Sequence, residues 1–116
     1  MDVKRGDIWL VNLDPTIGHE IKKSRPAVII QNDLGNKLSP IILIAPLTSQ
    51  HLERVNPIEV LVLCAQSGLA KDSKALLNQI RAVDKQRLVK RLGKMNETTL
   101  EKINDALKIS FGLIKL

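Results

Sequence analysis

A set of polar side chains stands at the ends of apolar segments, where catalytic or binding groups could be held in place. Arg25 precedes Pro26 and the apolar run 27–31, and Thr48 follows the apolar run 41–47. Proline biases the residue before it toward an extended backbone, and a strand end holds a side chain more rigidly than a loop tip. Such an arginine offers a fixed cation and paired donors that suit phosphate oxygens. The set is Arg25, Asn32, Thr48, Ser49, Gln50, Gln79 and Arg81.

The residue types alone do not identify a reaction, since any single member of the set could be an ordinary polar surface residue. Other catalytic patterns are missing: His19 and His51 form no HxH or HExxH motif, and the sequence contains no glycine-rich phosphate loop and no GxSxG elbow. The single cysteine, Cys64, forms neither an intrachain disulfide nor a cysteine-based metal site. No metal and no cofactor are therefore expected. The two histidines could act as base and acid on RNA, but polar segments more often carry solvated histidines.

The elements that must position these residues are mostly strands. Segments 7–13, 27–31, 41–47 and 58–63 are apolar and β-branched, and 32–40 carries two turn signals and is predicted as a loop. Pro46 cannot donate to a ladder, so it predicts an edge or a bulge there. Segment 73–83 fits a helix or a strand, and its length and flanks favour a strand. The sequence DKQRL predicts one helical turn, and LVKRL a short strand.

The C-terminal segment predicts one amphipathic helix over residues 97 to about 114. Asn96 is a good N-cap, and apolar residues recur at helical spacing up to Ile114, with Phe111 facing the core. At 116 residues the chain predicts a single domain, 1–116. The architecture is expected to be α+β, a small, curled, mostly antiparallel sheet closed by the C-terminal helix.

The formal net charge of +6 is carried by residues 71–94, which hold eight Lys and Arg against Asp72 and Asp84. Such a segment suits a polyanion or an acidic protein partner, or is a solvated surface.

The only aromatic side chains are Trp9 and Phe111, so extensive base stacking is excluded. The charged N-terminus lacks the pattern of a secretory signal, and no apolar run could span a bilayer, so the cytoplasm and no membrane contact are expected.

Four motifs together resemble the MazF/PemK family, the ribonuclease toxins of bacterial toxin–antitoxin pairs. They are RGDIWLVNLDPTIGHE at 5–20, SRPAVIIQND at 24–33, APLTSQ at 45–50 and LLNQIRAVDKQRLVKRLGKM at 76–95. They follow the family's order and spacing over nearly the whole chain, and the MazF/EndoA-like branch is most similar. The resemblance implies an SH3-like β-barrel with a C-terminal helix, assembled as a homodimer, and a strand at 73–83.

The resemblance also implies an activity and its residues. The activity is sequence-specific, metal-independent cleavage of single-stranded RNA by 2′-hydroxyl transesterification, which leaves a 2′,3′-cyclic phosphate and a 5′-hydroxyl, and an acidic antitoxin protein neutralises it. Two family motifs, SRP and PLTSQ, place the catalytic residues at Arg25 and Thr48. His19 and His51 depart from the branch pattern in loops that recognise the substrate. The positions implied to contact RNA are Glu20, Asn32, Ser49, Gln50, Gln79 and Arg81.

Two other functions fit the same fold. Toxins with this barrel also act by binding and inhibiting DNA gyrase without cutting anything, and fold alone does not separate the two activities. The intact Arg25 and Thr48 motifs favour the nuclease, and the C-terminus SFGLIKL lacks the tryptophan of the gyrase-binding toxins. A catalytically silent nucleic-acid binder is the third alternative.

Overall fold

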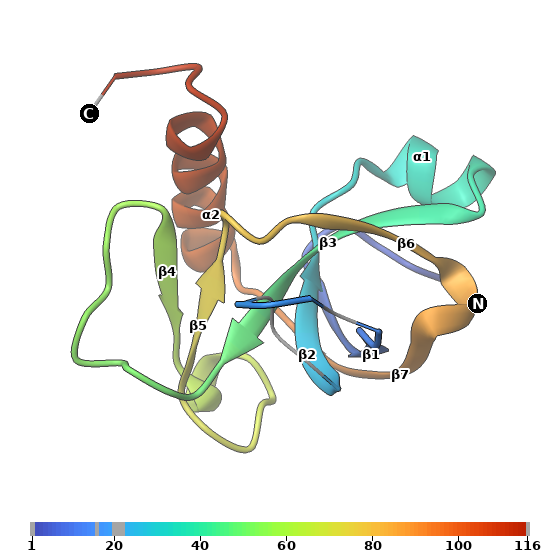
Figure 1. The fold of residues 1–116 in the computed structure, drawn as a ribbon, viewed down its shortest axis with the longest axis horizontal. Helices are drawn as coiled ribbons and strands as arrows, with labels where there is room; N and C mark the ends of the chain where they lie inside the picture. The colour runs from blue at the N-terminus through green and yellow to red at the C-terminus, as the bar shows by residue number, and fades with distance from the viewer. Residues whose placement is uncertain (1, 16, 20–22, 116) are drawn as a thin grey trace.

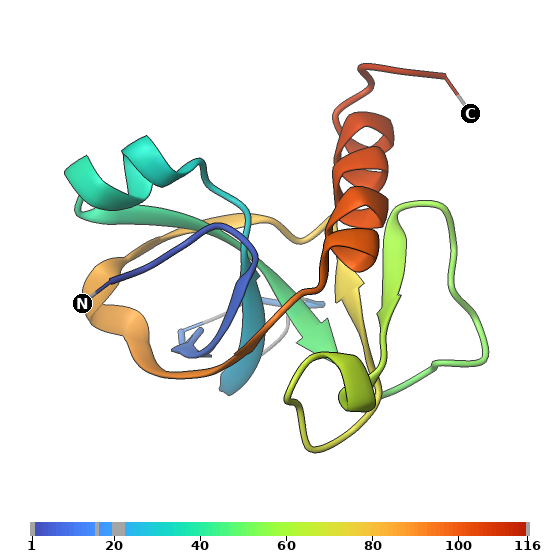
Figure 2. The ribbon, with the colours of Figure 1, turned by 180° about the vertical axis from the view of Figure 1, so that it is seen from behind.

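The computed structural model describes residues 2–15, 17–19 and 23–115. The elements are β1 (Asp7–Asn12), β2 (Ser24–Ile29), α1 (Asp33–Leu38), β3 (Ile41–Thr48), β4 (Glu59–Val62), η1 (Cys64–Gln66), β5 (Ser73–Leu76), β6 (Arg81–Asp84), η2 (Lys85–Arg87), β7 (Leu88–Lys94) and α2 (Glu97–Ser110). The antiparallel sheet has the order β4-β5-β3-β2-β1-β7, with β6 also paired to β3. Strands β1, β2, β3, β6 and β7 curl around one side of the molecule, and α2 stands beside β4 and β5 on the other (Figure 1 and, from behind, Figure 2).

The central strand is β3, which is paired along both of its edges. On one edge its residues 44–46 pair with β2. On the other edge residues 41–44 pair with β6, and residues 47 and 48 pair with β5. This one strand therefore joins the curled part of the sheet to the part that lies beside α2.

Of the predicted edge or bulge at Pro46, the edge is wrong, because Pro46 lies inside the sheet at a point where the pairing of β3 is interrupted. It is buried and stands in register with Ala27 of β2. On the opposite edge of β3 it falls in the gap between the β6 pairing, which ends at Ile44, and the β5 pairing, which begins at Leu47. A residue without an N–H is tolerated where a ladder is interrupted.

The curled strands are not closed into a barrel by hydrogen bonds between strands, as far as the described residues go. The turn η2 links β6 to β7, and two arginines, one at the start of β6 and one in η2, bridge to the end of β1 and the residues after it. Arg81 Nη1 donates to Leu13 O at 2.8 Å, and Arg87 Nη1 donates to Asn12 O at 3.0 Å and also to Asp14 O. The predicted α+β class, an antiparallel sheet with a C-terminal helix, is confirmed.

Two hydrophobic clusters follow from the alternation of side chains along the strands. One fills the interior of the curled strands and the other lies between the sheet and α2. The first cluster consists of Val3, Trp9, Val11, Leu13, Ala27, Ile29, Ile42, Ile44, Val83 and Leu88. The second consists of Ile8, Val28, Ile30, Ala45, Leu47, Val60, Val62, Ala75, Leu77, Met95, Ile103 and Ala106. Neighbouring residues of β3 therefore serve different clusters.

The segment predicted as a loop at 32–40 contains the short helix α1, so that prediction is wrong. Asn32 is its N-cap, and the Asn32 Oδ1 accepts a hydrogen bond from Gly35 N at 2.8 Å. The buried Asn36 side chain donates from Nδ2 to Gln31 O at 2.9 Å. Asparagine and glycine signal turns in a sequence, but the same residue types cap a helix when their side chains find these partners.

The helix α2 begins as predicted and ends earlier. Asn96 is the N-cap, and its Oδ1 accepts from Thr99 N at 2.8 Å. The helix stops at Ser110, before Gly112, whose φ is +70°. Phe111 is 62% exposed, so the prediction that it faces the core is wrong. No helix in the described part of the chain is long and apolar enough to cross a membrane.

The segment 73–83, predicted as one strand, forms two strands, one at each end. Residues 73–76 form β5 and residues 81–84 form β6, but a turn at 77–80 separates them, so the two strands pair with different parts of β3. The predicted helical turn is η2, and the predicted short strand after it is β7.

Gly93 in β7 is held against the loop after η1. A Cβ built on Gly93 would lie 1.9 Å from Ser67 O, a backbone atom that cannot turn away. We expect Gly93→Ala to lower the free energy of unfolding by about 1–3 kcal/mol or more, as overpacking does elsewhere. Urea denaturation measures the change, with Val89→Ala as the control because Val89 lies in the same strand and is 57% exposed. Equal midpoints for the two variants would contradict this packing.

Candidate active site

Arg25 and Thr48 lie at the same end of the paired strands β2 and β3. The recorded pairs run from Ile29 opposite Ile44 to Ala27 opposite Pro46. Continued by two residues beyond its last pair, that register would set Arg25 opposite Thr48, on the same face of the sheet as Ala27. Directly opposed residues on one face have Cβ atoms about 4.5–5.5 Å apart. At that separation a single phosphate would be within reach of a guanidinium and a hydroxyl from adjacent strands.

The Thr48 hydroxyl is oriented by the turn that follows it. Its Oγ1 accepts a hydrogen bond from Gln50 N at 3.2 Å. A hydroxyl accepts through its lone pairs and keeps one hydrogen to donate, so Thr48 retains a donor for a substrate oxygen. Ser49 and Gln50 follow immediately and are exposed. The predicted residues Arg25, Thr48, Ser49 and Gln50 thus lie at one end of the β2–β3 pair.

A pocket of about 320 Å³ adjoins this pair, and Arg25 and Ser49 line it. Its apolar wall includes Pro26 and Leu47, which alternate to the other face of the sheet, and its far side is the loop before β5 with Lys71. Thr48 does not line it, so the pocket lies beside the Arg25–Thr48 pair. Its volume is in the range of small-molecule pockets.

The loop at the far side of the pocket is tied down by Asp72. Asp72 Oδ1 accepts a hydrogen bond from Cys64 N at 2.8 Å, which joins the start of η1 to the start of β5. This bond is the main reason why the pKa of the Asp72 carboxyl is lowered. The hydrogen bond between the Cys64 thiol and the same carboxylate is the main reason why the pKa of Cys64 is raised, with desolvation and the negative charge adding to it.

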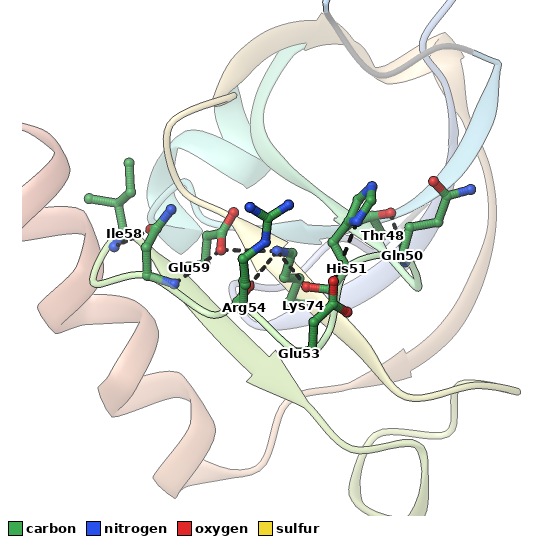
Figure 3. Close-up of polar contacts among 9 residues, drawn as sticks. Thr48, Gln50, His51, Glu53, Arg54, Ile58, Glu59 and Lys74 are labelled. Atoms are coloured by element: carbon green, nitrogen blue, oxygen red, sulfur yellow. Dashed lines mark hydrogen bonds and ion pairs between the residues drawn. The ribbon is translucent and has the colours of Figure 1, made fainter.

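The segment after Thr48 is anchored by a lysine that sequence reasoning counted only as surface charge. Lys74 is 5% exposed. Its Nζ donates to His51 O at 3.0 Å, to Arg54 O at 2.7 Å and to Glu59 Oε1 at 3.0 Å (Figure 3). The sequence carries only a weak signal for it, since Lys74 follows Asp72 and Ser73 and precedes an apolar run, 75–77.

The histidines lie on the surface. His51 is exposed and has a φ of 56°, in the left-handed region. Its Nδ1 lies 3.7 Å from Glu53 Oε1, and the pKa of Glu53 is lowered chiefly by the backbone N–H of Glu53, with smaller contributions from His51 and Arg54. His19 is exposed in the loop between β1 and β2. In the described residues no group of three His, Cys, Asp or Glu side chains could hold a metal ion.

The other residues predicted to contact RNA are spread out. Asn32 follows the opposite end of β2, roughly 20 Å from Arg25 at the usual rise of a strand. Gln79 lies in the turn between β5 and β6, and Arg81 begins β6 with its guanidinium bonded to Leu13 O. Glu20 lies outside the described residues.

The basic segment 71–94 presents less free charge than its sequence suggests. Lys74 is buried, the guanidinium groups of Arg81 and Arg87 donate to carbonyls at the end of β1, and Arg91 Nε lies 3.3 Å from Asp7 Oδ1. Lys71, Lys90 and Lys94 are exposed, on the loop before β5 and on β7.

Comparison with known proteins gives consistent matches. The family described as "PemK-like, MazF-like toxin of type II toxin-antitoxin system" matches residues 4–111. Endoribonuclease EndoA of Bacillus subtilis is 40% identical over 114 residues, 98% of each chain. Endoribonuclease MazF of Staphylococcus saprophyticus is 40% identical over 111 residues, 96% of this chain and 92% of that protein.

Solved structures share the fold at lower identity. An endoribonuclease from a mycobacterial species, in complex with its cognate antitoxin, has a TM-score of 0.81 at 23% identity, over 98% of this chain and 99% of that one. MazF from Deinococcus radiodurans has a TM-score of 0.81 at 22% identity, over 97% and 98% of the two chains.

The contact between Cys64 and Asp72 predicts a protected thiol. Because the raised pKa keeps Cys64 protonated over a pH range in which an ordinary thiol ionises, its alkylation should be slow at about pH 8.5. We expect Asp72→Asn to lower that pKa and to speed alkylation by iodoacetamide severalfold, followed by mass spectrometry from pH 7 to 10. Asp84→Asn, which does not touch Cys64, is the control. If the pH profile of the alkylation rate is the same in Asp72→Asn as in the wild-type protein, the interaction between Cys64 and Asp72 is contradicted.

Proposed function

Because the chain belongs to the PemK-like, MazF-like toxin family of type II toxin–antitoxin systems and is an endoribonuclease, we propose that it cleaves single-stranded RNA at a short sequence without a metal ion. The observation that carries this proposal is the pairing of β2 with β3, whose register, continued by two residues, would set Arg25 opposite Thr48. The pair supplies a cation and a hydroxyl donor at the same end of two rigid strands, where a phosphate can contact both.

In the proposed reaction the RNA supplies the nucleophile. The 2′-oxygen attacks the adjacent phosphorus and loses its proton, and the bond from phosphorus to the 5′-oxygen breaks as that oxygen gains a proton. The products are a 2′,3′-cyclic phosphate and a 5′-hydroxyl. Arg25 stabilises the charge that develops on the phosphate oxygens, because an arginine keeps its proton near neutral pH and is a poor base. Thr48 donates its hydroxyl hydrogen to the same phosphate.

Recognition of the RNA sequence would come from side chains around this pair. Ser49 and Gln50 are nearest and exposed, and their hydroxyl and amide groups can bond the Watson–Crick edges of unstacked bases. Asn32, Gln79, Arg81 and Glu20 complete the proposed RNA contacts. Asn32 lies at the other end of β2, so it would contact a nucleotide away from the one that is cleaved.

The proposed partners are a second copy of this chain and an acidic antitoxin in the cytoplasm. The net charge of +6 favours an acidic segment that folds on binding and competes with RNA. Of the structural relatives, the mycobacterial endoribonuclease was solved with its cognate antitoxin, which supports the same kind of partner here.

Arg25→Ala should reduce cleavage by at least about 100- to 1000-fold, and Thr48→Ala by somewhat less, because each removes a donor to the charged transition state. Arg25→Lys should also lose much of the activity, because a lysine cannot make a paired contact. The assay incubates purified protein with a long single-stranded RNA in EDTA and maps the fragment ends, with Lys108→Ala on α2 as the control. Discrete cuts with 5′-hydroxyl ends are expected.

Three outcomes would contradict parts of the proposal. No cutting by the wild-type protein on varied RNAs would favour the binding function, and inhibition of DNA gyrase would then be assayed. Near-full activity of Arg25→Lys would exclude the paired contact. A limb at about pH 6–7 in the rate profile that disappears in His51→Ala would assign acid–base catalysis to that histidine.

Binding should weaken as salt rises, because cations that contact phosphates release counterions from RNA. For single strands the slope of log affinity against log salt is about −0.7 per phosphate contact, so Arg25→Ala should make it shallower by about that amount. An RNA with a 2′-deoxy group at the cleavage site can be bound without being cut, and fluorescence anisotropy gives its affinity. An unchanged slope would mean that Arg25 does not contact a phosphate in the bound state.

A further inference from the structure

The segment 49–58 connects the end of β3 to β4 and has no regular structure to hold it. It begins directly after Thr48, and most of it is exposed. Its last residue is tied to the sheet, because Ile58 O accepts from Leu77 N at 3.0 Å, just after β5. The hydrogen bonds within residues 49–57 are local, such as Arg54 N to His51 O at 3.2 Å. Local turns of this kind do not fix where a segment lies relative to the sheet.

The buried ammonium of Lys74 supplies that link. Its three acceptors are His51 O, Arg54 O and Glu59 Oε1, so all three N–H groups of the ammonium have a partner within 3.0 Å. Two of these acceptors are carbonyls of the segment itself (Figure 3). The third, the Glu59 carboxylate, also accepts from Asn56 N at 3.1 Å, which fixes the far end of the same segment.

The position of Lys74 in the sheet connects this anchor to the active site. Lys74 stands in register opposite Thr48 in the pairing of β5 with β3. The lysine therefore fixes the segment from the strand that pairs with the last residue of β3. His51 has a φ of 56°, which an ordinary side chain seldom adopts, and its carbonyl is one of the groups that Lys74 holds.

We propose that Lys74, together with Glu59, is a positioning pair that fixes the segment 49–58 and thereby sets the base preference of cleavage. The proposal rests on the proposed nuclease function. Lys74 does not touch the RNA, because its Nζ is buried and fully bonded. It acts through Ser49 and Gln50, whose direction beside Thr48 depends on the segment that continues from them.

The test compares Lys74→Met, which keeps the length of the side chain and removes its donors, with Glu59→Gln, which keeps the shape and removes the charge. Lys108→Met on α2 is the matched control. Hydrogen exchange of the amides in residues 50–59 is measured first, because it does not depend on activity. Faster exchange there, with α2 and β7 unchanged, is expected for both variants, and more strongly for Lys74→Met.

Cleavage kinetics then separate positioning from a general loss of folded protein. On short RNAs with the preferred site or with one base changed, the ratio of kcat/KM values should fall by about 10- to 100-fold in Lys74→Met, since small displacements of positioning groups have effects of this size. KM should rise more than kcat falls. Unchanged exchange and an unchanged ratio, or an equal loss on every RNA that follows the unfolded fraction, would overturn the proposal.

Two possible complications, an unfolded variant and an inactive wild-type protein, are covered by the same measurements. If Lys74→Met does not fold, the same two measurements on Glu59→Gln decide the proposal. If the wild-type protein cleaves no RNA, the nuclease function fails, whereas the exchange measurement still shows whether Lys74 orders the segment.

Discussion

The pairing of β3 on both edges is the constraint on which the rest of the structure depends. Because side chains alternate along a strand, Ile42 and Ile44 enter the cluster inside the curled strands, while Ala45 and Leu47 enter the cluster under α2. A slip of one residue would exchange these sets, and so the two clusters together fix the register. The same strand sets Thr48 opposite Lys74 of β5. The packing of the core and the geometry of the candidate site are therefore set by one strand.

Several arginine and lysine side chains in this protein form hydrogen bonds that join segments distant in the sequence. Part of the net positive charge is therefore structural and is not available to a partner. Arg81 and Arg87 hold the end of β1, and Arg5 joins the N-terminal segment to α2 through Asn104 Oδ1 at 2.8 Å. Lys74 holds the segment after β3. A buried ion pair contributes little net stability compared with apolar residues of the same volume, but losing one partner is costly because the other charge stays buried. Such pairs favour one arrangement of the surface segments over others.

The candidate site contains few catalytic residues because the proposed reaction needs few catalytic groups from the protein. The 2′-hydroxyl of RNA is already a nucleophile beside the phosphorus, so the protein needs to supply charge, a donor and orientation. In the proposed reaction Arg25 and Thr48 would provide these from adjacent strands, and the sheet would keep them in place. In the proposed function, discrimination between RNA sequences would depend on the surrounding segments.

The sequence by itself determined the family, the strands and the start of the C-terminal helix, because these follow from local patterns and motifs, and the same motifs predict Arg25 and Thr48 as catalytic. It did not determine that 32–40 contains a helix or that Phe111 is exposed, since both depend on which side chains find capping and packing partners. Only the tertiary structure decided that Lys74 is buried, because its acceptors lie up to 23 residues away in sequence and meet it only when β5 pairs with β3.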